Sequence, residues 1–209
     1  MTSRRWSQLA GGWFLAFGVG IVIALQLQSR GDWNQGLEWE RELLRSMHVT
    51  LPSALDTLLL IVPWFGTNIT LLPLVIAAAI VLFWRAHRRE MALQLVVANV
   101  GGWLLTFALK IMFERARPEL WEHRGQFAHA AFPSGHAIAS IAVLFTVATL
   151  LRRELGWRWP YLAAALLLSI SLYSRLYLGV HWPTDVIAGV LVGSVWLAVT
   201  LRTFGEPRG

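Results

Sequence analysis

Cysteine is absent from the sequence, and charged residues are scarce. Without cysteine there is no disulfide, no thiolate metal site and no cysteine nucleophile. Charged residues make up 14% of the 209 residues, whereas soluble domains carry about 25%. Because hydrophobic residues reach 56%, too few polar residues remain to cover a soluble core. This balance indicates a lipid bilayer as the surrounding solvent.

The net charge of +6 raises the question of nucleic-acid binding, since clustered Lys and Arg residues attract phosphates regardless of sequence. Here the basic residues sit in short clusters between apolar stretches. We therefore expect no nucleic-acid partner, and we expect membrane lipids to surround the protein.

Six charge-free stretches divide the chain. They are Trp6–Ser29, Thr57–Trp84, Met91–Leu109, Gly125–Leu151, Trp159–Ser174 and Val186–Leu201. A helix needs about 20 residues to cross the hydrocarbon layer. The last two stretches are shorter, but long flanking side chains that reach the interface complete them. The pattern predicts an all-α, polytopic membrane protein: a six-helix transmembrane bundle forming a single domain over residues 1–209.

Lys and Arg residues favour the cytoplasmic side of a membrane. With the N-terminus inside, slightly more of the 18 Lys and Arg residues fall on the cytoplasmic side, and at least three of the outer ones belong to the motifs described below. No small-residue cleavage site follows the first stretch, so we expect it to be a retained span. We therefore expect a multi-pass protein of the cell membrane with both termini cytoplasmic.

The longest outer connection runs over residues 30–63. Within it Leu37, Leu44, Met47 and Leu51 recur at helical spacing among charged residues. This pattern predicts a short interfacial helix in the first outer loop. The segment is either a lid over a lipid-binding pocket or a plain connector with one apolar stripe.

The first polar cluster, Lys110 with Arg117 and Pro118, follows the third stretch. If the helix continues through Arg117, the seven-residue spacing places both cations on one face, and Pro118 then ends it. An Arg fork and a Lys point charge together suit a multivalent anion such as phosphate. Contact with lipid headgroups is the alternative for this pair alone.

The second cluster is Pro133-Ser134-Gly135-His136, at the start of a helix in the fourth stretch. Ser134 is a favoured N-cap residue, and the free N–H groups of a helix start bind anions. Gly135 lets the backbone approach a ligand closely. His136 in the first turn is then able to donate or accept a proton near neutral pH.

The third cluster is Ser174-Arg175, then His181, then Asp185. On a helix that begins near Pro183, the four-residue spacing brings the Asp185 carboxylate to one ring nitrogen of His181. This contact would fix the tautomer and leave the other nitrogen able to attack. Taken alone, Asp185 is also a routine partner for the dipole of a helix N-terminus.

In this order the three motifs resemble the signatures of the type 2 phosphatidic acid phosphatase family, over about residues 100–190. The resemblance implies that His181 is the catalytic nucleophile, that Asp185 orients it and that His136 protonates the leaving oxygen. The residues that it implies for phosphate binding are Lys110, Arg117, Ser134, Gly135 and Arg175. Such a cationic site carries out phosphoryl transfer without a metal, so we expect no metal and no cofactor.

The sequence therefore predicts an integral membrane lipid phosphatase that works through a phosphohistidine, in a pocket on the outer face of the membrane. Candidate substrates are a polyprenyl pyrophosphate such as undecaprenyl pyrophosphate, a phosphatidylglycerol phosphate and a phosphatidic acid. Transfer of the phosphoryl group to a second lipid is an alternative reaction. A vanadate haloperoxidase has a similar anion pocket, but six apolar spans argue against a soluble oxidoreductase. A non-catalytic lipid-binding protein would normally lack one of the key side chains, and here all are present.

Overall fold

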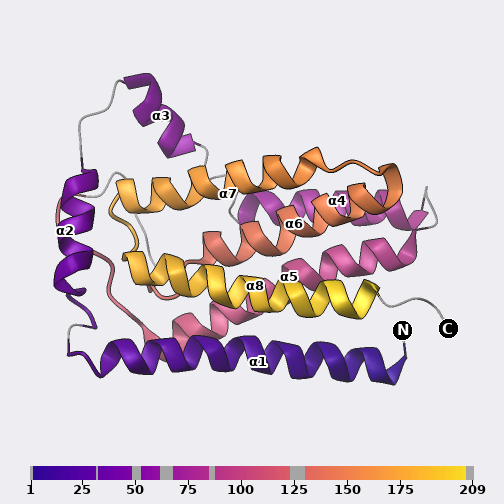
Figure 1. The fold of residues 1–209 in the computed structure, drawn as a ribbon, viewed down its shortest axis with the longest axis horizontal. Coiled ribbons are helices and arrows are strands. Elements are labelled where there is room, and N and C mark those ends of the chain that lie inside the picture. The colour runs from indigo at the N-terminus through magenta and orange to yellow at the C-terminus, as the bar shows by residue number, and fades with distance from the viewer. Residues whose placement is uncertain are drawn as a thin grey trace.

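The computed structural model describes residues 2–31, 33–48, 53–61, 68–84, 88–122 and 130–205, and these contain helices and no strand. The helices are α1 (Ser3–Gln28), α2 (Glu38–Met47), α3 (Ser53–Ile61), α4 (Asn68–Trp84), α5 (Arg89–Phe113), α6 (Gly135–Leu155), α7 (Trp159–Tyr177) and α8 (Pro183–Gly205). The predicted all-α class is confirmed for this part of the chain. The long helices run along a common axis, and α2 stands across one end of the bundle (Figure 1).

Helix α6 is the centre of the bundle and contacts α4, α5, α7 and α8. Helix α8 also packs against α1 and α5. Glycines make these close contacts possible: a Cβ on Gly101 of α5 would lie 2.1 Å from the Trp196 ring of α8. The Trp196 indole N–H then donates to the Ala98 carbonyl at 2.9 Å. Small residues at helix crossings are typical of membrane bundles, in which backbones approach closely.

Four of the described helices, α1, α5, α6 and α8, are long and apolar enough to cross a membrane. Large apolar side chains such as Phe14, Phe107 and Leu191 are exposed on the outside of these helices, as a lipid environment allows. The chain is therefore a multi-pass membrane protein. The predicted count of six spans remains a prediction, because α7 lies outside this group of four.

Two predicted stretches differ from the helices that the structure describes. The stretch 57–84 is divided between α3 and α4, and the sequence between these helices contains Pro63 and Gly66, both of which disfavour helix. Residues 62–67 themselves lie outside the described part. The stretch 125–151 becomes helical at Gly135, and residues 125–129 of that prediction also lie outside the described part.

A short helix, α2, is present in the connection that follows α1, as the spacing of its leucines predicted. Helix α2 buries Glu40 and Leu44 and exposes Trp39 and Leu43. Leu51, the last residue of the predicted stripe, lies outside the described residues. That α2 lies in the membrane interface stays a prediction.

Candidate active site

All three polar clusters lie at one end of the bundle. There α5 ends, α6 begins, α7 ends and α8 begins, and α2 stands across this end (Figure 1). The segments that connect these helix ends are held together by backbone hydrogen bonds. The Ala131 N–H donates to the Arg115 carbonyl at 2.8 Å, and the Ser134 N–H donates to the Asp185 carbonyl at 2.9 Å. Residues far apart in the sequence are thereby fixed in one neighbourhood.

His181 is the buried centre of this neighbourhood, with 3% of its surface exposed. Burial lowers the pKa of His181 well below its usual range, and the positive charges of Arg117, Lys110 and Arg175 lower it further. A hydrogen bond with the Ala131 backbone acts in the opposite direction. At neutral pH the imidazole is therefore neutral, with a ring nitrogen able to act as a nucleophile.

Lys110 and Arg117 reach this site from different local structures. Helix α5 ends at Phe113, and Glu114 adopts a left-handed conformation with φ 40°. The expectation that the helix continues through Arg117 is therefore wrong. A left-handed residue ends the helix, and Pro118 in turn disfavours helical geometry at the residue before it.

Both cations are nevertheless anchored at the site. The Lys110 ammonium donates to the Ala130 carbonyl, and the Arg117 guanidinium donates to the Val180 carbonyl. These two carbonyls belong to the segments that lead into α6 and into α8. Burial lowers the pKa of Arg117 from its usual value, and the negative charge of Asp185 raises it. The two cations are thus anchored to the segments that precede α6 and α8, within electrostatic reach of His181.

Ser134 is the N-cap residue of α6, as predicted, with extended backbone angles (φ −68°, ψ 109°). Its side chain makes no capping hydrogen bond. A Cβ on Gly135 would lie 2.9 Å from the Thr106 side chain, so packing against α5 also requires a glycine here. Ser134 Oγ and His136 Nε2 are buried and have no hydrogen-bond partner within the described part of the chain. Both are available to a ligand.

Asp185 faces His181 from the first turn of α8, which begins at Pro183. Its Oδ2 lies 3.6 Å from His181 Nδ1, within ion-pair range but longer than a hydrogen bond. The same Oδ2 accepts a hydrogen bond from the Trp182 N–H at 2.8 Å. Catalytic hydrogen bonds are often long until a ligand is bound, so this distance is compatible with an orienting contact.

Arg175 lies in the last turn of α7 and is 5% exposed. Its Nε donates to Ser174 Oγ at 3.4 Å, and Ser174 Oγ donates to the Ser171 carbonyl at 2.7 Å. His136 is within electrostatic reach of Arg175, His181 and the two other cations. The structure therefore brings together every residue that the sequence proposed for the site.

Two further charged residues at this end were not assigned a role from the sequence. Arg115 and Glu40 are 1% and 0% exposed, and they form an ion pair at 3.0 Å. Arg115 also pairs with Asp185 at 2.7 Å. A signal for Glu40 exists in the sequence, since it lies on the face of α2 that also carries Leu37 and Leu44. An acidic residue on an apolar stripe indicates a buried partner.

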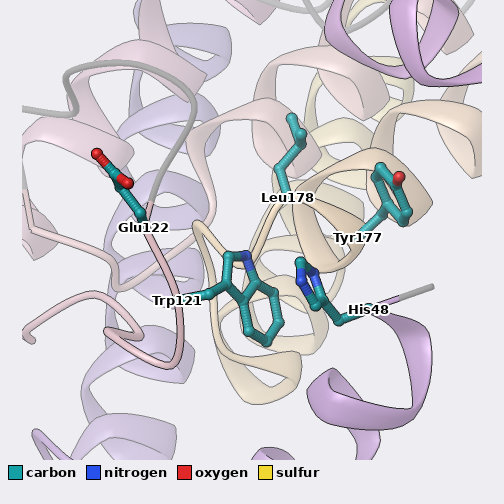
Figure 2. A pocket seen from close by; sticks show the side chains of 5 residues that line it. All are labelled: His48, Trp121, Glu122, Tyr177 and Leu178. Carbon is teal, nitrogen blue, oxygen red and sulfur yellow. The ribbon is translucent and has the colours of Figure 1, made fainter. Parts of the chain in front are cut away.

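A pocket lies beside the segment that carries His181. Figure 2 shows its lining residues His48, Trp121, Glu122, Tyr177 and Leu178. The His48 and Trp121 rings stack with their centroids 4.0 Å apart. The Trp121 ring also covers Gly179, where a Cβ would lie 2.5 Å from it and where φ is +65°. None of the predicted site residues lines this pocket.

Comparison with known proteins gives a consistent result. A family model described as the PAP2 superfamily matches residues 91–208, more than half of the chain. An undecaprenyl-diphosphatase of Sulfolobus acidocaldarius is 29% identical over 184 residues, which cover 85% of this chain and 84% of that protein. Phosphatidylglycerophosphatase B of Bacillus subtilis is 31% identical over 135 residues, which cover 61% of this chain and 64% of that protein.

A solved structure also resembles the fold. It is the crystal structure of the first transmembrane PAP2 type phosphatidylglycerolphosphate phosphatase from Bacillus subtilis, with a TM-score of 0.76 and 22% identity. The likeness covers 90% of this chain and 93% of that one. At this identity it demonstrates a shared fold and no more.

Proposed function

The chain belongs to the PAP2 superfamily and is a membrane lipid phosphatase, and from this premise we propose that it hydrolyses a polyprenyl pyrophosphate with His181 as the nucleophile. The observation that carries the proposal is the convergence of three cations on one buried, neutral imidazole. An imidazole in this setting attacks phosphorus, and the cations neutralise the charge on the phosphoryl oxygens.

In the first step a ring nitrogen of His181 forms a bond to phosphorus while the bond from phosphorus to the leaving oxygen breaks. Lys110, Arg117 and Arg175 hold the phosphoryl oxygens, and Ser134 Oγ and the Gly135 N–H add hydrogen bonds. His136 gives its proton to the leaving oxygen, which departs as a lipid monophosphate. The contact with Asp185 stabilises the charge that develops on the attacking imidazole.

In the second step water attacks the phosphohistidine. His136, which has given up its proton, takes a proton from this water as the oxygen–phosphorus bond forms. The bond between phosphorus and His181 breaks, inorganic phosphate leaves, and both histidines return to their starting states. No step in this scheme requires a metal ion.

The lipid class rests on a relative whose sequence match covers 85% of this chain and 84% of that protein, an undecaprenyl-diphosphatase. In such a substrate the apolar tail stays in the bilayer while the pyrophosphate enters the end of the bundle. We place this end on the outer face of the membrane, with both termini cytoplasmic. The two spans beyond the four apolar helices are assigned to α7 and to the region of α3 and α4.

The proposal is tested with protein purified in detergent, by measuring inorganic phosphate released from polyprenyl pyrophosphate, phosphatidylglycerol phosphate and phosphatidic acid. Polyprenyl pyrophosphate is expected to be the best substrate, and His181→Ala is expected to abolish turnover while the protein stays folded. The matched control is His87→Ala, a histidine between α4 and the start of α5 in the sequence and outside all three motifs. More than a few per cent of wild-type activity in His181→Ala would refute the nucleophile assignment.

The same assay separates hydrolysis from phosphotransfer. A hydrolase releases phosphate when no acceptor lipid is added, whereas a phosphotransferase requires one. His136→Gln should slow both steps, because the first loses its acid and the second its base, and the phosphoenzyme that does form should persist longer than in the wild type. A phosphohistidine is labile in acid and persists in alkali, whereas stability in acid would point to a phosphorylated hydroxyl group and lability in alkali as well as acid to a phosphorylated carboxylate.

A further inference from the structure

Glu40 brings a carboxylate from α2 into the interior, although α2 lies outside the three motifs. Its Oε1 accepts hydrogen bonds from the Thr184 N–H at 3.0 Å and the Thr184 hydroxyl at 2.6 Å. Its Oε2 accepts from Arg115 at 3.0 Å and from the Leu37 N–H at 2.8 Å. Four donors therefore satisfy a carboxylate that is 0% exposed. One of them is an N–H in the first turn of α8, so Glu40 caps the helix that carries Asp185.

Arg115 connects Glu40 to Asp185. One Nη donates to Asp185 Oδ1 at 2.7 Å and the other to Glu40 Oε2 at 3.0 Å. Its Nε donates to the Trp33 carbonyl at 2.7 Å. The guanidinium also lies 4.9 Å from the Trp33 ring centroid and 5.6 Å from that of Trp182. With hydrogen bonds on all sides and 1% exposure, this planar group has one orientation available.

This arrangement determines how the Asp185 carboxylate faces His181. Arg115 occupies Oδ1, and the Trp182 N–H occupies one lone pair of Oδ2. Oδ2 also lies 3.6 Å from His181 Nδ1. Trp182 is itself fixed, because its indole N–H donates to the Ala116 carbonyl at 2.9 Å. The carboxylate is therefore held from two sides and directed at the imidazole.

We propose that Glu40 and Arg115 are positioning residues, which hold the Asp185 carboxylate in the orientation that receives the Nδ1 proton of His181. The inference rests on the proposed function, in which His181 is the nucleophile. It also assigns a role to α2. The hydrogen bonds of Glu40 with Thr184 hold this helix against the start of α8, which favours a fixed structural support over a mobile lid.

The charges around Asp185 determine the pH at which activity is lost, and this pH can be measured. The cations that act on Asp185 are Arg115 and Lys110, Arg117 lies within electrostatic reach, and His181 faces it directly. Removing Arg115 takes away the cation and the hydrogen bond that favour the charged form of the buried Asp185 carboxylate, so Asp185 takes up a proton more readily. A protonated Asp185 cannot accept from His181, so activity is lost at a higher pH than in the wild type.

Arg115→Met is expected to lower kcat about 100-fold, which is less than the roughly 10⁴-fold cost of disabling the orienting carboxylate in a serine triad. KM for polyprenyl pyrophosphate should stay within about threefold, because Arg115 does not touch the phosphate. The acid limb of the pH–rate profile should move to higher pH. Arg115→Lys keeps the positive charge but cannot donate to Asp185 and Glu40 at the same time with the planar geometry of a guanidinium. Its acid limb should therefore return toward that of the wild type, with only partial recovery of kcat.

The double variant Glu40→Gln/Arg115→Met tests whether Glu40 acts through Arg115. Asp185 lacks its Arg115 hydrogen bond in both variants, so the acid limb should stay where it lies in Arg115→Met and kcat should fall no further. Arg5→Met is the matched control, since Arg5 pairs with Glu90 at 2.9 Å on α1 and α5, and it should change neither quantity. Thermal unfolding and gel filtration in detergent identify variants that fail to fold, and for those the single-turnover rate of the folded fraction is compared.

The outcomes distinguish this inference from the proposed function. Turnover by His181→Ala would overturn the proposed function itself. Loss of turnover in His181→Ala together with a wild-type kcat and acid limb in Arg115→Met would overturn only the positioning role. A folded Arg115→Met protein with raised KM and unchanged kcat would also overturn it, because Arg115 would then act in substrate binding.

Discussion

Replacing Gly189 by alanine should impair catalysis through a single methyl group. Gly189 of α8 faces the start of α6, where an added Cβ would lie 2.6 Å from the Ser134 carbonyl oxygen and 2.8 Å from the Ala137 Cβ. The Ser134 carbonyl accepts from the Ile138 N–H in the first turn of α6, so it cannot move alone. The methyl group would therefore push the beginning of α6 away from α8.

The size of the effect follows from this geometry. To restore ordinary contact the carbonyl must retreat from 2.6 Å to 3.4 Å, a movement of about 0.8 Å. Overpacking of this kind costs about 1–3 kcal/mol, while replacing a helical glycine by alanine returns about 0.5–1 kcal/mol. Stability should thus fall by no more than about 2.5 kcal/mol. A misplacement near 1 Å costs up to about 100-fold in rate, so kcat should fall about 10- to 100-fold.

The matched control is Gly18→Ala in α1, where an added Cβ meets nothing within 4 Å. It makes the same chemical change without the collision, so kcat should be unchanged and the melting temperature equal or slightly higher. Phosphate release and thermal unfolding are measured for both variants in the same detergent. If Gly189→Ala matched Gly18→Ala in both measurements, the reasoning that the α6–α8 contact sets the position of the site would be refuted.

Three further predictions concern pH and metal ions. Because the pKa of His181 is lowered, kcat/KM should persist as the pH falls below about 6.5, the usual histidine value. It should decline as His181 or its partner Asp185 takes up a proton, and an acid limb at or above that pH would contradict a neutral His181 beside a charged Asp185. The stabilising contribution of buried His181 is likewise full above about pH 6.5 and lost as the pH falls toward its lower folded pKa, which unfolding curves against pH would follow. EDTA should leave phosphate release unchanged, whereas a loss restored by added Mg²⁺ would show a metal requirement.

The family and the enzyme class were predictable because phosphoryl chemistry needs particular side chains at particular spacings. Lys110 with Arg117, Ser134 with His136, and His181 with Asp185 each form a local pattern within about a dozen residues. The match of residues 91–208 to the PAP2 superfamily confirms the predicted membership. The catalytic role of each residue remains a prediction.

Local geometry at the helix ends was harder to predict. The continuous helix expected through Arg117 ends at Phe113, because Glu114 adopts a left-handed conformation that sequence spacing does not reveal. A charge-free stretch likewise does not show where it divides, as the separate helices α3 and α4 demonstrate. Hydropathy reports which residues tolerate lipid, and turn geometry depends on contacts made by other segments.

The pairing of Glu40 with Arg115 could not be predicted from the sequence for a different reason. The two residues are far apart in the chain, and only packing brings them together. Their inclusion changes the charge balance of the site. When Lys110 is protonated, the cations of the site are Lys110, Arg117, Arg175 and Arg115, and the anions are the carboxylates of Glu40 and Asp185. These six groups together carry a net charge of two positive charges. A phosphate monoester carries about −1.5 to −2 charges at neutral pH. The carboxylates of Glu40 and Asp185 therefore offset part of the positive charge at the site, and we expect this to limit how tightly the site retains the inorganic phosphate that turnover must release.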